Sequence, residues 1–233
     1  MLRKGFILAA ILFHTLFVYA QSGALQTFTL DRPYPVERLQ PPKGKKVRNV
    51  ILMIGDGMSL MHIQAAWTVN HGHLWLENAQ ATGLSMTPAT NRLITDSGSG
   101  GTSLATGYKT AYHAVGVDPA GKPLKSLVDY AKEAGKSAGI AVTCRLWDAT
   151  PCDFISHNLD KEQDLVAEMI NSPVDFVFGG GAKYFEKRDD NRNLFKELQR
   201  KGYHVSRSFE DLQQNVKSGK VYCVPFDVDT SLP

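Results

Sequence analysis

Cysteine, charge of one sign and long apolar runs are all scarce in this chain. Three of the 233 residues are cysteine, so at most one intrachain disulfide can form, and Cys144 and Cys152 lack the CxxC spacing of a zinc knuckle. Lys and Arg number 26 against 23 for Asp and Glu, without long basic blocks, which gives no indication of a nucleic-acid partner. We expect Cys144, Cys152 and Cys223 to be buried or free thiols without a chemical role.

The first 20 residues have the pattern of a secretory signal peptide. Arg3 and Lys4 precede an apolar stretch from Phe6 to Tyr19, and Ala20 ends a small-x-small motif. An apolar run of about 14 residues is shorter than the roughly 20 that span a bilayer, which disfavours the alternative of a membrane anchor. We therefore expect cleavage after Ala20 and an exported chain, periplasmic or secreted, with no membrane segment after cleavage.

Residues 21–46 differ from the rest of the chain in being polar and rich in proline. Their four prolines, Pro33, Pro35, Pro41 and Pro42, forbid a long helix and predict an extended lead-in. The folded domain is expected over residues 47–233. With 43% hydrophobic residues, the chain has enough apolar surface for a core, which excludes a disordered or collagenous chain.

Apolar patterns along the domain alternate between strand and helix. Residues 50–54 form a continuous apolar run typical of a strand covered on both faces, and residues 59–69 have helical spacing. Further strands are expected over 138–143 and 176–178, and further helices over 123–134, 165–170 and 193–201. This alternation predicts an α/β fold of three layers, with a mostly parallel central sheet and helices on both faces.

Open α/β sheets place their functional sites at the carboxyl ends of strands, which directs attention to Asp56. It follows the first predicted strand between Gly55 and Gly57. A carboxylate at this position suits a metal ion. The alternative is an aspartate that only forms a turn or caps a helix.

Residues 95–107 are almost all small. If Ser97 opens a helix that runs toward Thr106, the free N–H groups and the dipole at its start would attract an anion such as phosphate. The alternative is a flexible Gly/Ser loop. The segment lacks the lysine of a nucleotide-binding P-loop, and the first glycine of a GxSxG motif around Ser99 is absent.

Asp148 and Thr150 offer a carboxylate and a hydroxyl just after the predicted strand 138–143. Oxygen ligands of this kind fit a hard cation such as magnesium. The alternative is that Thr150 caps a helix whose first residue is Pro151.

Taken together, the motifs NVILMIGDGM, DSGSGGTSLATGYKT, DATPCDFISH and VFGGGAKYF occur in that order between Asn49 and Phe185. This order resembles the alkaline phosphatase family. The resemblance implies a phosphomonoester hydrolase that uses two zinc ions, one magnesium ion and a phosphoserine intermediate. It also implies a possible homodimer.

The same resemblance implies roles for five residues of this chain. Ser97 matches the nucleophile and zinc ligand, and Asp56 matches the carboxylate that bridges a zinc and the magnesium. Thr150 matches a magnesium ligand, and Asp148 matches a position that orders magnesium-bound water. Asp96 matches a residue that helps to hold the phosphate site.

One further position departs from the family pattern. Lys161 stands where the family places an arginine that grips two phosphate oxygens. Lysine keeps the charge but loses the bidentate geometry, so we expect weaker phosphate binding; the alternative is a solvated surface lysine.

The family's remaining ligands, a glutamate, two aspartates and three histidines, follow the matching region and have no counterparts here. The resemblance therefore implies an alkaline phosphatase-like fold with an incomplete C-terminal half. One hypothesis is a truncated phosphomonoesterase, and the other is a non-catalytic, exported phosphate- or metal-binding protein. A sulfatase is disfavoured because no C/S-x-P-x-R motif surrounds Ser97.

Overall fold

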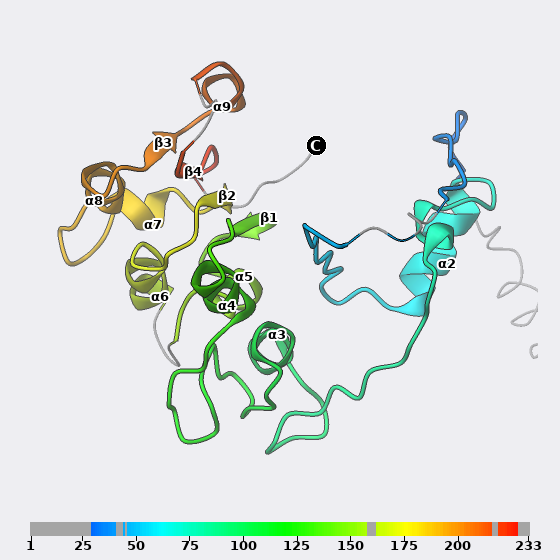
Figure 1. The fold of residues 1–233 in the computed structure, drawn as a ribbon, viewed down its shortest axis with the longest axis horizontal. Helices are drawn as coiled ribbons and strands as arrows, with labels where there is room; N and C mark the ends of the chain where they lie inside the picture. Colours follow the sequence, from blue (N-terminus) through cyan, green and yellow to red (C-terminus); the bar gives the residue numbers. More distant parts are fainter. Residues whose placement is uncertain (1–28, 41–43, 45, 158–161, 216–218, 228–233) are drawn as a thin grey trace, which may run out of the picture. The chain divides into compact units, whose positions relative to one another are not determined.

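The computed structural model describes residues 29–40, 44, 46–157, 162–215 and 219–227 (Figure 1). The chain divides into two compact units, Met1–Gly83 and Leu84–Pro233. Of the candidate site residues, Asp56 belongs to the first unit and all others belong to the second.

The described part of the first unit contains the helix α2 (Leu60–Val69) and the 3-10 helix η1 (Trp75–Asn78). α2 confirms the helix predicted over residues 59–69. Residues 29–40 form neither helix nor strand, and asparagine side chains bind their backbone. Asn70 Oδ1 accepts a hydrogen bond from Tyr34 N at 2.8 Å, and Asn78 Oδ1 accepts one from Leu39 N at 2.7 Å.

Residues 50–54 do not form the strand that their apolar run predicts. The side chains of Ile51 and Met53 are 83% and 85% exposed. The described part of the first unit holds no strand, so residues 50–54 have no neighbouring strand there with which to form ladder hydrogen bonds. The prediction is wrong for this structure because apolar composition selects segments that suit a buried strand, whereas pairing is what forms one.

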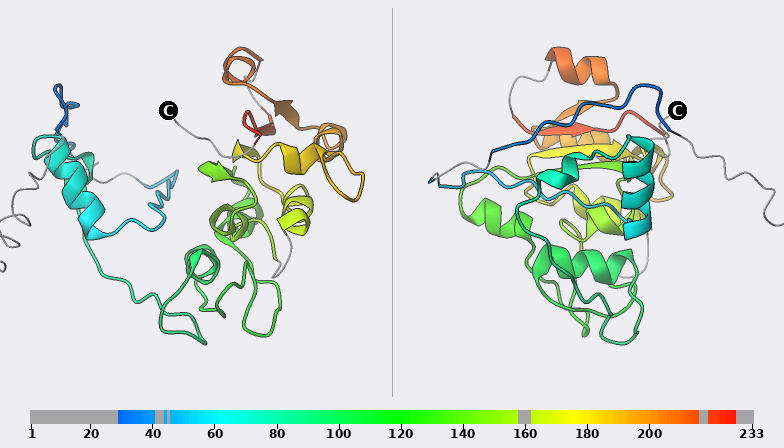
Figure 2. Two further views of the ribbon diagram at one scale, coloured as in Figure 1. Left: turned by 180° about the vertical axis from the view of Figure 1, so that it is seen from behind. Right: turned by 90° about the vertical axis from the view of Figure 1, so that its right-hand side faces the viewer.

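The second unit is built on a four-stranded parallel sheet (Figure 2). Its strands are β1 (Gly139–Arg145), β2 (Phe176–Gly180), β3 (His204–Ser206) and β4 (Val221–Cys223), in the order β1-β2-β4-β3. In register, Gly139 faces Phe176, which faces Val221. The predicted α/β class with a parallel sheet is confirmed, while β3 and β4 were not expected from the sequence.

Helices pack around this sheet. They are α3 (Ser97–Thr106), α4 (Leu127–Glu133), α5 (Ala149–Cys152), α6 (Glu162–Met169), α7 (Lys183–Glu186), α8 (Leu194–Arg200) and α9 (Phe209–Asn215). α5 contacts β1, and both α8 and α9 contact β3. The helices predicted over 165–170 and 193–201 are confirmed as α6 and α8.

α4 begins later than the predicted range 123–134. Ser126 caps it, because its Oγ accepts a hydrogen bond from Val128 N at 3.1 Å. Asp129 Oδ2 accepts one from Ser126 N at 2.8 Å in return. Pro123 instead forms an isolated antiparallel bridge with Val117. The reciprocal capping pair, rather than the apolar spacing, sets the start of the helix.

The core of the second unit contains a cluster of aromatic rings. Phe185 is fully buried, stacks on Phe195 with 4.8 Å between ring centroids, and meets the edge of Tyr222 at 6.4 Å. The Tyr222 hydroxyl donates a hydrogen bond to the carbonyl of Met169 at 3.0 Å, and burial raises the pKa of Tyr222. This cluster ties α6, α7 and α8 to β4.

A partly buried ion pair fixes the start of β1. Lys132 Nζ lies 2.8 Å and 2.7 Å from the two carboxylate oxygens of Asp175, and Ala138 N donates to Asp175 Oδ2 at 2.9 Å. Burial alone raises the pKa of Asp175, but the hydrogen bonds from Lys132 and Ala138 outweigh it and lower the pKa. The carboxylate therefore joins α4 to the residue before β1.

None of the three cysteines, Cys144, Cys152 and Cys223, forms a disulfide, which agrees with the expectation from the sequence. Burial raises the pKa of Cys152, whose thiol donates to the Leu146 carbonyl. Among the described residues, no helix is both long and apolar enough to cross a bilayer. The predicted signal segment, residues 1–20, lies outside the described residues.

Replacing Phe185 by alanine should remove the centre of the aromatic cluster. We expect the free energy of unfolding to fall by about 3–5 kcal/mol, because a large cavity replaces the ring. Urea unfolding followed by tryptophan fluorescence measures this change. Leu127→Ala on the exposed side of α4 is the control and should cost less than about 1 kcal/mol; equal losses would contradict the assigned core.

Candidate active site

Ser97 is the first residue of α3, as the small-residue motif predicts. Its side chain is exposed, whereas Gly98 and Ser99 are buried. The N–H groups of a first helical turn have no partner within the helix, and the positive end of the dipole favours an anion there. α3 therefore presents a hydroxyl beside an anion-attracting helix end. The flexible-loop alternative is wrong.

Asp96 caps this helix with its carboxylate. Oδ1 accepts hydrogen bonds from Ser99 N at 3.1 Å and from Ser99 Oγ at 2.7 Å, and Oδ2 lies 3.0 Å from His113 Nδ1. Burial alone raises the pKa of Asp96, but the hydrogen bonds from Ser99 and His113 outweigh it and lower the pKa. A charged carboxylate thus precedes Ser97 directly, and Ser99 serves the cap.

α3 packs closely on α5 through a buried polar contact. Thr102 and Asp153 are almost completely buried, and Thr102 Oγ1 donates to Asp153 Oδ1 at 2.9 Å. The same hydroxyl accepts a hydrogen bond from Gly116 N at 2.8 Å. A Cβ atom on Gly101 would lie 1.9 Å from Asp153 Oδ2, so only glycine allows the two helices to approach this closely.

α5 carries the candidate magnesium ligands. Asp148 is its N-cap residue and Thr150, half-buried, lies inside the helix, so the alternative in which Thr150 caps and Pro151 begins the helix is wrong. Arg145 engages both carboxylate oxygens of Asp148: its Nη2 lies 3.1 Å from Oδ1, and its backbone N–H donates to Oδ2 at 3.2 Å. The Asp148 charge is therefore partly compensated within the chain.

Asp56 lies in the first unit, on a turn closed by a hydrogen bond from Met58 N to Gly55 O at 3.0 Å. Its side chain is exposed, and Gly57 takes the left-handed conformation with φ of 67°. The turn agrees with the alternative in which the aspartate of the GDG motif forms a turn. It also leaves the carboxylate on the surface of its unit, where a ligand can reach it.

Lys161 lies outside the described residues. His157, four residues before it, is held by two side-chain contacts. Both ring nitrogens of His157 face acceptors: Nδ1 lies 2.9 Å from Glu168 Oε1, and Nε2 lies 3.0 Å from the Leu124 carbonyl. The hydrogen bond to Glu168 raises the pKa of His157 against the opposing effect of burial. Burial raises the pKa of Glu168, but the hydrogen bonds from His157 outweigh it and lower that pKa.

Arg145 and His113 contact the candidate residues Asp148 and Asp96, and Asp153 contacts Thr102 of α3, but none of the three was identified from the sequence. Arg145 also lies over the ring of Trp147, 4.1 Å from its centroid. Its position three residues before Asp148 was the available signal, since such spacing allows a local ion pair. Asp153 could have been noticed as a carboxylate within a short, otherwise uncharged helical segment.

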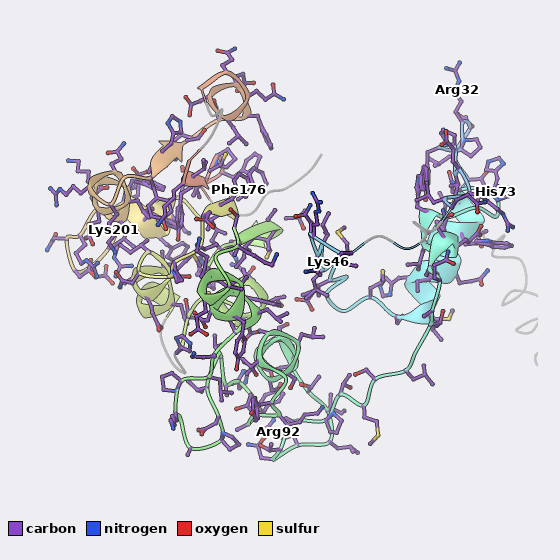
Figure 3. The ribbon with its side chains drawn as sticks, in the orientation of Figure 1. Arg32, Lys46, His73, Arg92, Phe176 and Lys201 are labelled. Carbon is purple, nitrogen blue, oxygen red and sulfur yellow. The ribbon has the colours of Figure 1, made fainter. Side chains whose placement is uncertain are left out.

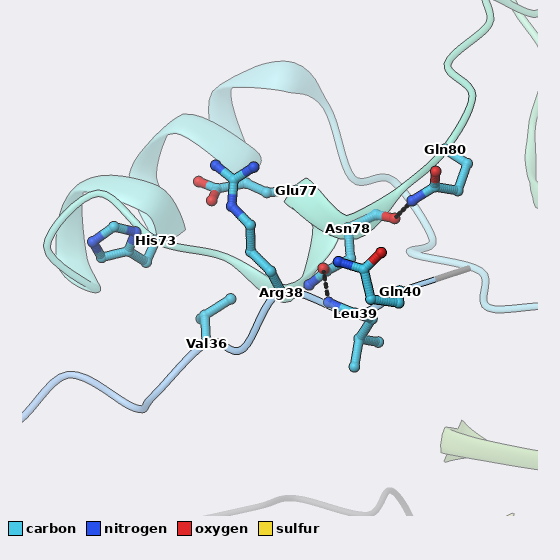
Figure 4. Close-up of a pocket in the computed structure, with 8 residues that line it drawn as sticks. All are labelled: Val36, Arg38, Leu39, Gln40, His73, Glu77, Asn78 and Gln80. Carbon is cyan, nitrogen blue, oxygen red and sulfur yellow. Dashed lines mark hydrogen bonds between the residues drawn. The ribbon is translucent and has the colours of Figure 1, made fainter. Parts of the chain in front are cut away.

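A shallow pocket of about 400 Å³ lies in the first unit (Figure 4). Asn78, on its wall, is occupied by hydrogen bonds to the backbone of Leu39 and Glu37. The lining is polar and largely exposed, and it holds none of the candidate site residues. It comprises Val36, Arg38, Leu39, Gln40, His73, Glu77, Asn78 and Gln80.

The described residues do not gather a complete metal-binding set. No three of their His, Cys, Asp or Glu side chains lie close enough together to hold a metal ion. A structural zinc site needs four ligands, and a catalytic one needs three from the protein. The residues present therefore do not fit a two-zinc centre by themselves.

Comparison with known proteins shows the family to which this chain belongs. The family model for alkaline phosphatase matches residues 47–224. The chain belongs to the alkaline phosphatase family. It is 38% identical over 189 residues to alkaline phosphatase 4 of Bacillus subtilis, covering 73% of this chain and 40% of that one. It is 31% identical over 209 residues to the repressible alkaline phosphatase of Saccharomyces cerevisiae, covering 78% and 37%.

Solved structures of the family agree. Alkaline phosphatase from Thermus thermophilus superposes with a TM-score of 0.70 at 29% identity, covering 90% of this chain and 44% of that chain. A mutant of the alkaline phosphatase from the Antarctic bacterium TAB5, which has Mg bound, gives 0.71 at 28% identity, covering 75% and 51%. This family member thus spans about two fifths of the length of the curated relatives it matches.

The Thr102 hydroxyl can be removed almost without changing shape by Thr102→Val. We expect the free energy of unfolding to fall by about 1–3 kcal/mol, because Asp153 and Gly116 N each lose a buried hydrogen bond. Chemical denaturation measures the loss. Thr106→Val, on the half-buried end of the same helix, is the matched control and should cost less; a neutral Thr102→Val would contradict the role of this contact.

The His157–Glu168 pair predicts a pH-dependent stability. The folded pKa of His157 is raised, so its contribution is complete below the unfolded value of about 6.5 and disappears as pH rises through the folded value. The effect should stay below about 1 kcal/mol, since both groups are partly exposed. In urea titrations at several pH values, His157→Gln should flatten the fall of the free energy of unfolding above about pH 6.5. The control His73→Gln should leave this pH dependence unchanged. An unchanged pH dependence in His157→Gln would refute the assignment.

Proposed function

We propose that this chain carries the nucleophile region of a phosphomonoester hydrolase that acts through Ser97. The observation that carries the proposal is the position of Ser97: exposed, first in α3, and preceded by a capping carboxylate. Membership of the alkaline phosphatase family supports the reaction class. The substrate is accordingly a phosphate monoester.

In the proposed reaction, Ser97 Oγ attacks phosphorus, and the bond between phosphorus and the ester oxygen breaks. The Ser97 hydroxyl gives up its proton as the new bond to phosphorus forms, the leaving alkoxide takes up a proton in exchange, and a phosphoserine remains. Water then breaks the serine–phosphate bond, which releases phosphate and restores the hydroxyl. α3 contributes positioning and the positive end of its dipole, and Asp96 fixes the first turn of that helix. Lys161 is proposed to attract the phosphate by charge.

Two zinc ions and one magnesium ion are the proposed cofactors, and they would supply Lewis acidity. Asp56, Ser97, Asp148 and Thr150 are the residues of this chain that would contribute oxygen ligands. Because the described residues do not complete such a centre, the remaining ligands are proposed to come from outside the described residues. We propose dimer formation on the same family grounds, and export on the signal-peptide pattern of residues 1–20.

The second candidate function is non-catalytic binding of phosphate or a metal ion. The incomplete donor set favours it, since α3 can attract an anion without any metal-dependent step. The first function includes hydrolysis of the bound phosphate monoester, whereas the second consists of binding alone. Phosphate binding without hydrolysis by both the chain and a completed protein would favour the second.

The deciding experiment is hydrolysis of a chromogenic phosphate monoester with zinc and magnesium present. It uses the 233-residue chain and a fusion of residues 1–224 to the remaining segment of the Bacillus subtilis relative. We expect turnover by the fusion, and Ser97→Ala should reduce kcat at least about a thousandfold.

Ser103→Ala is the matched control, because this serine lies on the same helix and its hydroxyl bonds only the carbonyl of Ser99 in the contacts described. Its kcat should stay within about twofold of the unaltered fusion. Turnover that survives Ser97→Ala would refute the proposed nucleophile. A folded fusion that binds phosphate calorimetrically but shows no turnover would favour the binding protein.

A further inference from the structure

His113 has a backbone conformation that is uncommon for a residue with a side chain. Its φ is 69°, in the left-handed region that favours glycine, although His113 carries a full side chain. Strained residues of this kind persist where the surrounding contacts hold them, and they gather at functional sites. The contacts of His113 therefore indicate what the conformation achieves.

The backbone N–H and the ring Nδ1 of His113 both face the Asp96 carboxylate. Its backbone N–H donates to Asp96 Oδ1 at 3.3 Å, and its ring Nδ1 lies 3.0 Å from Asp96 Oδ2. The Asp96 side chain is 17% exposed, whereas that of His113 is 73% exposed. The imidazole thus closes over the outer oxygen of a mostly buried cap.

The same loop also packs against the residue on the other side of Ser97. A Cβ atom on Gly98 would lie 3.1 Å from the Ala114 carbonyl oxygen and 3.3 Å from the carbonyl carbon of His113. Residue 113 therefore binds Asp96, on one side of Ser97, and residues 113 and 114 leave no free space for a side chain at Gly98, on the other side. This arrangement leaves Ser97 itself exposed.

Neighbouring rings hold the loop in place. The Tyr112 and His113 rings meet edge to face with 4.2 Å between centroids, and the Arg92 guanidinium lies 4.3 Å from the Tyr112 centroid. Asn91 Oδ1 accepts a hydrogen bond from Tyr112 N at 2.9 Å. Figure 3 shows Arg92 on the loop that precedes α3.

We propose that His113 is a positioning residue for Ser97, which holds the Asp96 cap and the first turn of α3 in the geometry that presents the nucleophile. The proposal rests on the proposed function of Ser97. A surface ion pair with an exposed histidine contributes little to stability, so the role lies in orientation.

The test uses three substitutions that separate side chain from backbone. His113→Gly removes the imidazole and relaxes the left-handed conformation, so the fold is retained. His113→Asn keeps a residue that tolerates this conformation and places a side-chain N–H close to the position of Nδ1. His71→Gly is the matched control, because His71 is also an exposed histidine with positive φ, at 56°, and its ring binds the Leu30 carbonyl instead.

The first readout is amide hydrogen exchange of Ser99 in the 233-residue chain, which needs neither metal nor turnover. We expect His113→Gly to speed exchange of the Ser99 N–H about fivefold, because its acceptor Asp96 loses the contact between Oδ2 and the imidazole and is held less firmly. Millimolar imidazole should restore the slow rate, and His113→Asn and His71→Gly should keep it. The thermal midpoint should move by less than about 3 °C in all three.

The second readout is the kinetics of the completed fusion protein. His113→Gly should lower kcat about tenfold with KM within about twofold, because orientation of the nucleophile is lost and substrate affinity is kept. His113→Asn should restore most of kcat. Unchanged Ser99 exchange in His113→Gly, or a loss that His113→Asn and imidazole fail to restore, would overturn the proposal.

Failure of the proposed function gives a different result. If Ser97→Ala leaves turnover intact, Ser97 is not the nucleophile, whatever the exchange data show. If exchange responds to His113→Gly but kcat does not, His113 only stabilises the cap, and the positioning proposal is refuted while Ser97 keeps its role.

Discussion

The close approach of α3 to α5 at Gly101 determines where the candidate site can form. A side chain at this position would collide with the Asp153 carboxylate. The hydroxyl of the next residue, Thr102, donates a hydrogen bond to the same carboxylate. Since buried carboxylates are costly without hydrogen-bond partners, the contact fixes both the distance and the register of the two helices. Ser97 begins one of these helices and Thr150 lies on the other. Their relative position is therefore inherited from packing in the middle of α3, one turn away from Ser97.

The small residues of α3 now have two different physical roles. Gly101 permits helix packing, whereas Gly98 permits the loop at His113 and Ala114 to pass beside the first turn. Neither role requires a flexible segment, and the helix is regular from Ser97 to Thr106. A composition that is typical of a mobile loop thus builds a rigid element with neighbours on several sides. The exposed Ser97 hydroxyl stands on that element, which is a better platform for a nucleophile than a loop would be.

The sequence predicted the parts of this fold that depend on local signals. α3 starts at Ser97 and β1 and β2 lie close to their expected ranges, because caps and apolar runs are local. The run at residues 50–54 was misassigned, since a strand depends on a partner that local sequence does not reveal. β3 and β4 have only three residues each and were missed for lack of a recognisable run. In the candidate site, Asp96 and Ser97 were proposed from their motif and the family resemblance, whereas His113 and Arg145 matter only through contacts that folding creates.

Asp96 poses an electrostatic problem for any phosphate that approaches Ser97. A carboxylate at the N-terminus stabilises the helix through its dipole, yet the same charge repels a phosphate group. The structure reduces this conflict by engaging both Asp96 oxygens, Oδ1 with the backbone and hydroxyl of Ser99 and Oδ2 with the ring of His113. Each hydrogen bond disperses negative charge away from the exposed side of the helix end. The cap can therefore order the first turn while the positive end of α3 stays available to an anion, and the strained backbone of His113 is the conformation that makes both N–H contacts at once.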